Sequence, residues 1–359
     1  MKIVFTTTIY LPHIGGIEVC IHEIAQHLIK TGNDVCVIVA DRECTSPTVG
    51  FIENERIIRI PAYEICNFFV LKRKSYLQII DNEIKGADVV HVNVCKFLFD
   101  YFARKKTKYK YKLIATSHGW LYHTNNYKFI KDFYFKNIIA QYSKYYDKII
   151  NVSHQDQDIA ESFGIVNSCV ILNGVNLEKY SGIPEKEVFS NVFMYWGRIS
   201  ENKGIYECLK KLSKYKTDFV FYIIGRCEDN KYMDKLKEFI ITQKMDNKIV
   251  FCGALSNKEI RDKIIESDII LMPSLHEGFG MTLVECLASN RPIIANNIES
   301  YEYILRSTNA EAYLFDFCDE ESEIDEKIQY LVTHKVRPEN IEQYSVNTMA
   351  KKTIDVYGI

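Results

Sequence analysis

The residues best suited to carry chemistry lie near the end of an apolar run in the second half of the chain. Ile269–Met272 leads into a glycine-containing turn and then into a stretch with helical periodicity. Glu277 lies in the turn, and Glu285 lies a little over one helical turn beyond a helix start predicted near Gly280. Carboxylates accept hydrogen bonds from hydroxyl groups, and the first N–H groups of a helix have no partner within it. The pattern favours a site for a polyhydroxylated ligand.

Two cations follow another predicted strand, Val192–Trp196. Arg198 and Lys203 stand in the loop before the next helix, where arginine can fork onto phosphate oxygens and lysine supplies a point charge. Gly15 and Gly16 follow the first strand in the same way, and a glycine turn at a helix N-terminus suits an anion such as phosphate. Neither segment has the GxGxxG or GxxxxGK[ST] pattern, which disfavours a dinucleotide dehydrogenase and a P-loop enzyme. A plain strand-to-helix turn with solvated side chains remains the alternative.

The elements that would position these residues are short runs rich in Val, Ile and Phe, separated by stretches with helical periodicity. Such runs are typical of parallel strands buried on both faces, and their alternation with helices occurs twice. The sequence therefore predicts an α/β protein with two doubly wound domains, at 1–170 and 171–340, and a C-terminal helix at 341–359 that could return to the first domain. The predicted strands are Lys2–Thr7, Val35–Ala40, Val89–Val94, Leu113–Ser117, Ile149–Val152, Val192–Trp196, Phe219–Ile224, Ile249–Phe251, Ile269–Met272 and Pro292–Ala295.

Composition agrees with a two-domain globular chain. The 359 residues are 47% hydrophobic and 26% charged, which excludes disordered, collagen-like and disulfide-scaffold proteins. The 11 cysteines form no CxxC pair, so neither a zinc site nor a thioredoxin motif is indicated, and a reducing cytosol is the expected setting. With no signal peptide and no apolar run near ~18 residues, we expect a cytoplasmic chain, with a peripheral position at the inner face of the cell membrane as a further expectation.

Charge is distributed unevenly. Residues 66–148 contain 16 Lys and Arg against six Asp and Glu, a net charge of +10 in a chain whose total is −2. Aromatic residues are interleaved with these cations, a combination that suits an anionic lipid surface or an anionic acceptor. A solvated basic face on amphipathic helices explains the same residues equally well, and nucleic acid is not expected as a partner.

With these motifs in place, the chain resembles the retaining glycosyltransferases of family 4, which have the GT-B architecture of two Rossmann-like domains facing a central cleft. The resemblance rests on the E-x7-E formed by Glu277 and Glu285, headed by the letters EGFG. It extends over most of the chain through further segments in the expected order: the glycine pair at 15–16, Asn173–Val175, Gly197–Arg198, Lys203–Gly204 and Phe251–Leu255.

The resemblance implies a role for each matching position. Arg198 and Lys203 would hold the donor diphosphate, Glu285 the ribose hydroxyls, and Glu277 the transferred sugar. His118, at the end of a predicted strand, matches the family's active-site histidine near the sugar and the leaving phosphate. The implied catalytic residues are thus His118 and Glu277; the implied donor-binding residues are Gly15, Gly16, Arg198, Lys203, Leu255, Gly278, Phe279, Gly280, Met281, Thr282 and Glu285.

The function implied is transfer of a sugar, with retention, from a nucleotide-diphosphate-sugar donor to a glycan or lipid-linked acceptor, in bacterial surface polysaccharide assembly. A UDP-sugar is expected in preference to a GDP-sugar; the donor is a substrate, and neither a cofactor nor a metal is expected. A glycosidase, a nucleotide-sugar epimerase or phosphorylase of the same fold, and a non-catalytic nucleotide-sugar binding module remain alternatives. The chain departs from the family at 295–300, where a Gly-Gly-Pro-Glu turn is replaced by Ala-Asn-Asn-Ile-Glu-Ser.

Overall fold

The computed structural model describes residues 1–13, 15–93, 95–120, 128–227 and 229–358. The chain divides into two compact units, one formed by Met1–Gly174 with Gln343–Ile359 and the other by Val175–Glu342. The sequence placed the boundaries after residues 170 and 340. The C-terminal segment belongs to the N-terminal unit, which is the return that the sequence left open. Among the described residues, no helix is both long and apolar enough to cross a membrane.

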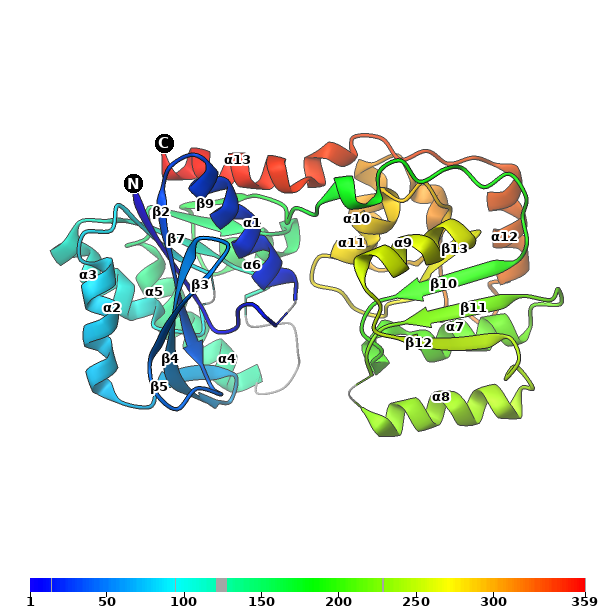
Figure 1. Cartoon of the computed structure of the whole chain (residues 1–359), viewed down its shortest axis with the longest axis horizontal. Helices are drawn as coiled ribbons and strands as arrows, with labels where there is room; N and C mark the ends of the chain where they lie inside the picture. The colour runs from blue at the N-terminus through cyan, green and yellow to red at the C-terminus, as the bar shows by residue number, and fades with distance from the viewer. Residues whose placement is uncertain (14, 94, 121–127, 228, 359) are drawn as a thin grey trace. The chain divides into compact units, whose positions relative to one another are not determined.

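The N-terminal unit is built on one sheet with the strand order β3-β4-β2-β1-β6-β7-β8-β9, and β5 pairs with β4 (Figure 1). The pairs from β4 to β9 along this order are parallel, whereas β3 and β5 run antiparallel to β4. The strands are β1 Lys2–Thr7, β2 Asp34–Asp41, β3 Thr48–Ile52, β4 Glu55–Ile65, β5 Phe68–Leu71, β6 Val89–Val92, β7 Lys112–Thr116, β8 Lys148–Asn151 and β9 Ser168–Val170.

Helices lie against this sheet through apolar faces. In the first of them, buried residues recur at helical spacing, from Cys20 and Ile21 to Leu28, and the helix ends before Gly32, whose φ of +85° suits glycine. The helices are α1 Gly16–Lys30, α2 Leu77–Ile84, α3 Phe99–Tyr109, α4 Lys128–Tyr134, α5 Ala140–Ser143, α6 His154–Ser162 and α13 Val346–Tyr357, with a π-helical segment at Phe135–Ile139.

The C-terminal helix α13 packs close to the N-terminal strands and to α1. A Cβ on Gly174 would lie 2.7 Å from the carbonyl oxygen of Ser345, so only a glycine lets the backbone approach the start of α13 this closely. At the other end of the helix, the hydroxyl of Tyr357 lies 2.6 Å from Nδ1 of His91 on β6. Both ends of α13 are therefore fixed within the N-terminal unit.

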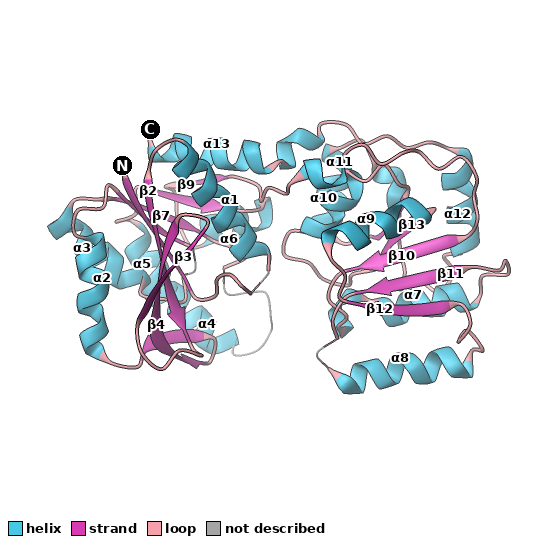
Figure 2. Ribbon diagram, viewed as in Figure 1, coloured by secondary structure: helices cyan, strands magenta, loops and turns pink. Residues whose placement is uncertain are grey.

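The C-terminal unit has one fully parallel sheet in the order β12-β11-β10-β13-β14-β15, with helices on both of its faces (Figure 2). Each unit is thus a doubly wound Rossmann-like domain. The strands are β10 Val192–Trp196, β11 Val220–Ile224, β12 Ile249–Gly253, β13 Ile269–Met272, β14 Ile293–Asn296 and β15 Leu314–Phe315; the helices are α7 Ile205–Ser213, α8 Asn230–Thr242, α9 Asn257–Glu266, α10 Met281–Leu287, α11 Glu299–Ser307 and α12 Ile324–Thr333.

All ten predicted strands are present, with ends shifted by two residues or fewer within the described part of the chain; the predicted end of one, Val94, lies outside the described residues. The strands that the sequence missed are β3, β4, β5, β9 and β15. Four of these carry exposed or half-buried residues along much of their length, and so lack the continuous apolar run of a buried parallel strand.

Candidate functional site

The loops that follow β10 and β13 come together at the carboxyl edge of the C-terminal sheet. These strands are neighbours in the sheet, and the amide of Leu275 donates to the carbonyl of Asn202 across 2.9 Å. Gly204, with φ of +64°, makes this approach possible, because a Cβ at this position would lie only 2.0 Å from the carbonyl oxygen of Pro273. The crevice outside the carboxyl ends of the strands is where doubly wound sheets bind ligands.

This junction brings Lys203 and Glu277 into direct contact. The Lys203 Nζ atom lies 2.6 Å from Oε1 of Glu277, and both side chains are 15% exposed. The same oxygen accepts hydrogen bonds from the hydroxyls of Ser274, at 2.9 Å, and of Tyr301, at 3.2 Å. Within the described part of the chain, every hydrogen bond to this carboxylate ends on Oε1. Oε2 is therefore the oxygen that can accept a hydrogen bond from a ligand.

Tyr301 is a site residue that the sequence did not single out. It lies on α11, is fully buried, and approaches the turn of Glu277 so closely that a Cβ on Gly280 would lie 2.8 Å from its ring. Burial, and then the charge of Glu277, raise the pKa of its hydroxyl well above the ordinary value. Tyr301 therefore remains protonated and acts as a hydrogen-bond donor to the carboxylate.

The turn at 295–300, which departs from the family pattern, supports the same loop. The side-chain amide of Asn296 donates to the carbonyl of Ser274 across 3.0 Å, and its oxygen accepts from the amide of Phe317 at 3.1 Å. Asn296 is buried, so both bonds are shielded from water. Asn296, in the segment that departs from the family pattern, thus holds the segment carrying Ser274 and Glu277.

Arg198 lies on the loop after β10. Its side chain is exposed, and its carbonyl accepts a hydrogen bond of 2.8 Å from the hydroxyl of Tyr195. Burial raises the pKa of Tyr195, the charge of Glu277 raises it further, and the charge of Arg198 lowers it, which places both charged groups near that hydroxyl. In the described chain, Arg198 makes no hydrogen bond or ion pair with Glu277, whose cationic partner is Lys203.

Glu285 has a different environment from Glu277. It is half-buried on α10, where burial raises the pKa of its carboxyl, while the charge of Lys179 and hydrogen bonds from Trp196 and Tyr180 lower it. The rings of Tyr180 and Trp196 are stacked with centroids 6.0 Å apart. No described bond joins Glu285 to Lys203, Arg198 or Glu277. The two acidic residues of the motif therefore have different described partners.

The other donor-binding residues expected from the resemblance lie at the same edge of the C-terminal sheet. Gly280, with φ of +100°, precedes α10, and the first hydrogen bond at this helix end is donated by the amide of Leu283, beyond those of Met281 and Thr282. Gly278 and Phe279 complete the turn before it. Leu255 is half-buried in the loop between β12 and α9.

In the N-terminal unit, His118 follows β7 in a backbone conformation with φ of +44° and is buried. Its Nε2 atom lies 3.3 Å from Oδ1 of Asn93. The carboxylate of Asp156 holds the loop, because it accepts hydrogen bonds from the hydroxyl of Ser117 and from the amide of Gly119, the latter at 2.8 Å. Asn93 and Asp156 are supporting residues that sequence patterns did not reveal, since neither stands in a motif.

The glycine pair of the N-terminal unit precedes α1, as expected, but its surroundings add a feature. A Cβ on Gly15 would lie 2.5 Å from Oε2 of Glu18, so the carboxylate of Glu18 lies over this turn. Glu18 is buried, and its burial raises the pKa of the carboxyl. The position expected for an external anion beside Gly15 and Gly16 is therefore close to a carboxylate of the chain itself.

Comparison with known proteins accounts for nearly the whole chain. The family model described as Glycosyltransferase Family 4 matches residues 14–179, and the model described as Glycosyl transferases group 1 matches residues 178–348. A GDP-mannose:cellobiosyl-diphosphopolyprenol alpha-mannosyltransferase of Xanthomonas oryzae pv. oryzae is 27% identical over 306 residues, which cover 84% of this chain and 80% of the relative. The protein of the same name from Komagataeibacter xylinus is 22% identical over 85% of this chain and 78% of the relative.

Solved structures agree in fold. Anabaena HepE, whose crystal structure was determined in complex with UDP and glucose, superposes with a TM-score of 0.74 at 15% identity, covering 100% of this chain and 99% of the other. The fold likeness extends over both Rossmann-like domains, and the two family models between them take in both E-x7-E residues and the glycine pair. The chain belongs to the family 4 glycosyltransferases and has the GT-B fold.

Proposed function

We propose that this glycosyltransferase moves a sugar from a nucleotide-diphosphate-sugar to a glycan or lipid-linked acceptor with retention of configuration, in the assembly of a bacterial surface polysaccharide. The observation that carries the proposal is the junction of Lys203 and Glu277, at 2.6 Å, at the carboxyl edge of the C-terminal sheet. At this junction a cation that can bind phosphate lies beside a carboxylate that can bind hydroxyl groups. The bond broken in a nucleotide-diphosphate-sugar joins a phosphate to a sugar, so one residue suits each side of that bond.

The chemical need of the reaction explains this arrangement. As the bond from the sugar to the diphosphate breaks, negative charge grows on the leaving phosphate and positive charge on the sugar ring. Lys203 and Arg198 would neutralise the first, and a carboxylate with one oxygen held rigidly would orient the sugar through the other. The positive charges supply what a divalent cation supplies elsewhere, which supports metal-independent transfer. Retention of configuration is proposed from the family resemblance.

Glu285 is proposed to bind the ribose. Its carboxylate lies near Trp196 and Tyr180, which lower its pKa, and it can accept hydrogen bonds from a pair of neighbouring hydroxyls. Leu255 and the turn from Gly278 to Thr282 are proposed to contact the donor. The roles expected of His118 and of the turn at Gly15 and Gly16, in the N-terminal unit, stay predictions.

The relatives indicate a different donor nucleotide from the one expected from the sequence. From the sequence, a UDP-sugar is expected in preference to a GDP-sugar. The two mannosyltransferases similar to this chain are named for GDP-mannose, at greater identity than HepE, which was solved with UDP. We therefore propose a GDP-sugar as the donor to test first. The same two relatives are named for a diphosphopolyprenol-linked acceptor, which supports a lipid-linked acceptor here.

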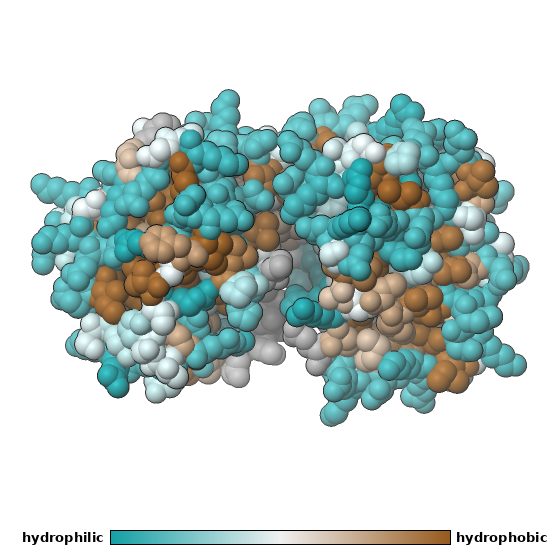
Figure 3. Space-filling model, in the orientation of Figure 1, coloured by the Kyte–Doolittle hydropathy of each residue, from teal (hydrophilic) through white to brown (hydrophobic). Residues whose placement is uncertain are grey.

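A surface of the N-terminal unit fits such an acceptor or the membrane that holds it. Exposed apolar side chains lie on the hairpin of β4 and β5 and on α4, and the two are joined by Phe68 and Tyr134, whose rings are 4.5 Å apart. We call this the amphipathic surface; its exposed apolar residues are Tyr63, Ile65, Val70, Phe129, Ile130 and Phe133. Lys72 lies over the ring of Tyr63, within the basic region predicted from sequence. Figure 3 shows hydrophobic residues interrupting the hydrophilic surface of the units.

The decisive experiment is product analysis with GDP- and UDP-sugars, with and without a diphosphopolyprenol-linked glycan. Sugar transfer to the acceptor, lost in Glu277→Gln by about 10²–10³-fold with far smaller loss of nucleotide binding, is the expected result. Wild-type rates from Glu277→Gln would remove Glu277 from the reaction. Free sugar without acceptor would indicate a glycosidase, an altered nucleotide-sugar an epimerase, and donor binding without turnover a binding module.

A further inference from the structure

A cavity of about 560 Å³ lies in the C-terminal unit at the edge of the sheet opposite the junction of Lys203 and Glu277. It is lined by Ile269, the first residue of β13, and by Pro292, which directly precedes β14, whereas the junction lies beyond the carboxyl ends of the strands. Its volume falls in the ~300–1,000 Å³ range of small-molecule sites. Its distance along the strands from the loops of the donor site makes it a separate site.

An apolar wall forms one part of the lining of this cavity. It is formed by side chains that the fold already buries, together with half-buried ones nearer the mouth: Ile269, Leu287, Pro292, Tyr313, Leu331, Phe189 and Val336. The hydroxyl of Tyr313, the one polar group of this set, donates to the carbonyl of Val336 at 3.0 Å. This part of the lining offers contact area that suits a hydrocarbon or aromatic body, beside the polar lining residues Asp268, Asn290 and Arg291.

Two of the cations around the cavity are fully used by the protein. The guanidinium of Arg291 donates to the carbonyls of Ile264, Ser267 and Pro184 at 2.7–3.0 Å, and so it closes the end of α9. Lys186 pairs with Asp268 at 2.9 Å. These groups hold the cavity's shape and have little capacity left for a ligand.

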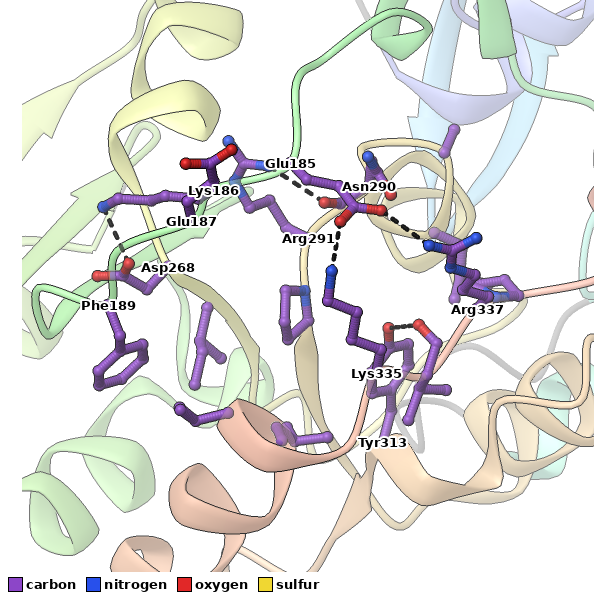
Figure 4. A pocket seen from close by; sticks show the side chains of 18 of the residues that line it. Glu185, Lys186, Glu187, Phe189, Asp268, Asn290, Arg291, Tyr313, Lys335 and Arg337 are labelled. Atoms are coloured by element: carbon purple, nitrogen blue, oxygen red, sulfur yellow. Dashed lines mark hydrogen bonds and ion pairs between the residues drawn. The ribbon is translucent and has the colours of Figure 1, made fainter.

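The charges at the mouth are arranged differently (Figure 4). Lys335 and Arg337 both reach the carboxylate of Glu185, at 2.6 and 3.1 Å, so two cations share one carboxylate. Arginine has five N–H donors and lysine three, and one carboxylate leaves most of them available. Glu185 marks where an anion sits at this mouth. Glu187 also lines the cavity, and it opposes a second negative charge unless Glu185 moves aside.

We propose that this cavity binds an amphipathic anion: a small molecule whose apolar body lies against the apolar wall and whose carboxylate or phosphate is held by Lys335 and Arg337, in competition with Glu185. The segments 185–189 and 335–341 both line it, and they belong to the two stretches by which the chain enters and leaves this unit. A ligand here would bridge those two stretches while the nucleotide site stays open.

The test is calorimetric titration of the full chain with octanoate, octyl phosphate and octanol, all below their aggregation concentrations. We expect octanoate or octyl phosphate to bind and octanol to bind at least about tenfold more weakly, because the charge pairing is lost. Comparing the affinities for octanoate and octyl phosphate shows whether the site prefers a carboxylate or a phosphate. Binding should be unaffected by saturating GDP or UDP; competition with either nucleotide would place the ligand in the donor site and overturn the proposal.

Variants separate this site from unspecific binding. Glu185→Gln should tighten binding of the anion, since the competing carboxylate is removed, whereas Lys335→Gln with Arg337→Gln should weaken it about tenfold. Lys248→Gln, which removes an ion pair between a half-buried lysine and the exposed Asp218 in the same unit, is the control and should change nothing. The substitutions at Glu185, Lys335 and Arg337 are at exposed positions that do not hold the core. Absence of binding by the wild type, equal affinity for octanol, or weaker binding by Glu185→Gln would each overturn the proposal.

Discussion

The ammonium of Lys203 lies 2.6 Å from the carboxylate of Glu277, although 74 residues separate them in the chain. This ion pair restricts the positions of both side chains. Lys203 fixes one oxygen of Glu277, and Glu277 gives Lys203 a defined position at the loop edge. Both side chains are largely shielded from water, so the attraction is less screened than that of a surface pair. A ligand diphosphate and this carboxylate would then compete for, or share, one cation.

Lys203→Ala should remove most of the affinity for a nucleoside diphosphate. A charge-assisted hydrogen bond to phosphate contributes about 1.5–3 kcal/mol, which is about 10–100-fold in affinity. The loss should be smaller for the nucleoside monophosphate, which lacks the second phosphate. Calorimetric titration of GDP, GMP, UDP and UMP measures both. Lys248→Ala is the control for removing a lysine from this unit, and equal losses for mono- and diphosphate would contradict the assignment.

Tyr301→Phe should slow turnover while leaving nucleotide binding nearly unchanged. The substitution removes the hydroxyl that donates to Glu277 at 3.2 Å, while the ring that packs against Gly280 stays. We expect kcat to fall by about tenfold or more, since a hydrogen bond to a charged group contributes about 1.5–3 kcal/mol and its loss also loosens the carboxylate. Steady-state kinetics give kcat and KM separately.

Tyr303→Phe is the matched control, because Tyr303 lies on the same helix with 37% of its surface exposed. In a Glu277→Gln background, Tyr301→Phe should have little further effect, because its partner has already been altered. An equal loss of kcat in both backgrounds would show that Tyr301 acts independently of Glu277.

The strands and the E-x7-E segment could be predicted because their signals are local. A parallel strand buried on both faces is a continuous apolar run, and β10 and β13 were located to the residue. The β3 strand, which is exposed along nearly all its length, has no such run. Pro61 in β4 further obscures a strand there, since proline is rare inside sheets.

The supporting residues of the site could not be predicted for a different reason. Tyr301 meets Glu277 only because β14 pairs with β13 and α11 follows β14, so their contact depends on the order of strands in the sheet. Asn296 was noticed only as a departure from the family pattern, and its two hydrogen bonds appear only when β13, β14 and β15 lie side by side. The spacing of residues in the sequence is enough to predict the motif, whereas the residues that support it depend on the order of strands in the sheet.

The amphipathic surface should bind anionic membranes through apolar residues on α4. Phe129 and Phe133 are 83% and 63% exposed and four residues apart, so they lie on one side of the helix. Replacing both with serine should reduce flotation with anionic liposomes several-fold, because apolar area buried in the interface is lost. Binding should also weaken with salt, since part of the attraction comes from lysines.

Val166→Ser is the control for that experiment. Val166 belongs to the same unit and is 91% exposed, but it lies outside the amphipathic surface. Its substitution should leave flotation unchanged. If Val166→Ser reduces flotation as much as the double phenylalanine variant, or if neutral liposomes bind as well as anionic ones, the surface is not the membrane contact.

Acid should destabilise the N-terminal unit through His91. Its ring is fully buried between the hydroxyls of Tyr357 and Thr116, at 2.6 and 2.7 Å, and burial, with a smaller effect of His118, lowers its pKa from 6.5 to about 3. The folded state thus keeps this ring neutral at pH values where the unfolded chain takes up a proton. The stability that depends on the neutral ring is complete above about pH 6.5 and falls by about 1.4 kcal/mol per pH unit as the pH decreases towards 3.

Urea unfolding followed by Trp120 fluorescence, in a Trp196→Phe background that leaves Trp120 as the single tryptophan, measures this loss in the right unit, because Trp120 is buried in the N-terminal core. At pH 7 the free energy of unfolding of His91→Gln should be lower than that of the parent, because the bonds to Tyr357 and Thr116 are lost. Between pH 7 and pH 5 it should then decrease less than that of the parent, because the variant lacks the one proton that His91 takes up on unfolding. His13→Gln removes a histidine whose side chain is 58% exposed and should keep the parent's slope. If His91→Gln and the parent lose stability in parallel, the acid sensitivity comes from other groups, such as Asp41 and Glu83, whose pKa values are lowered in the folded unit.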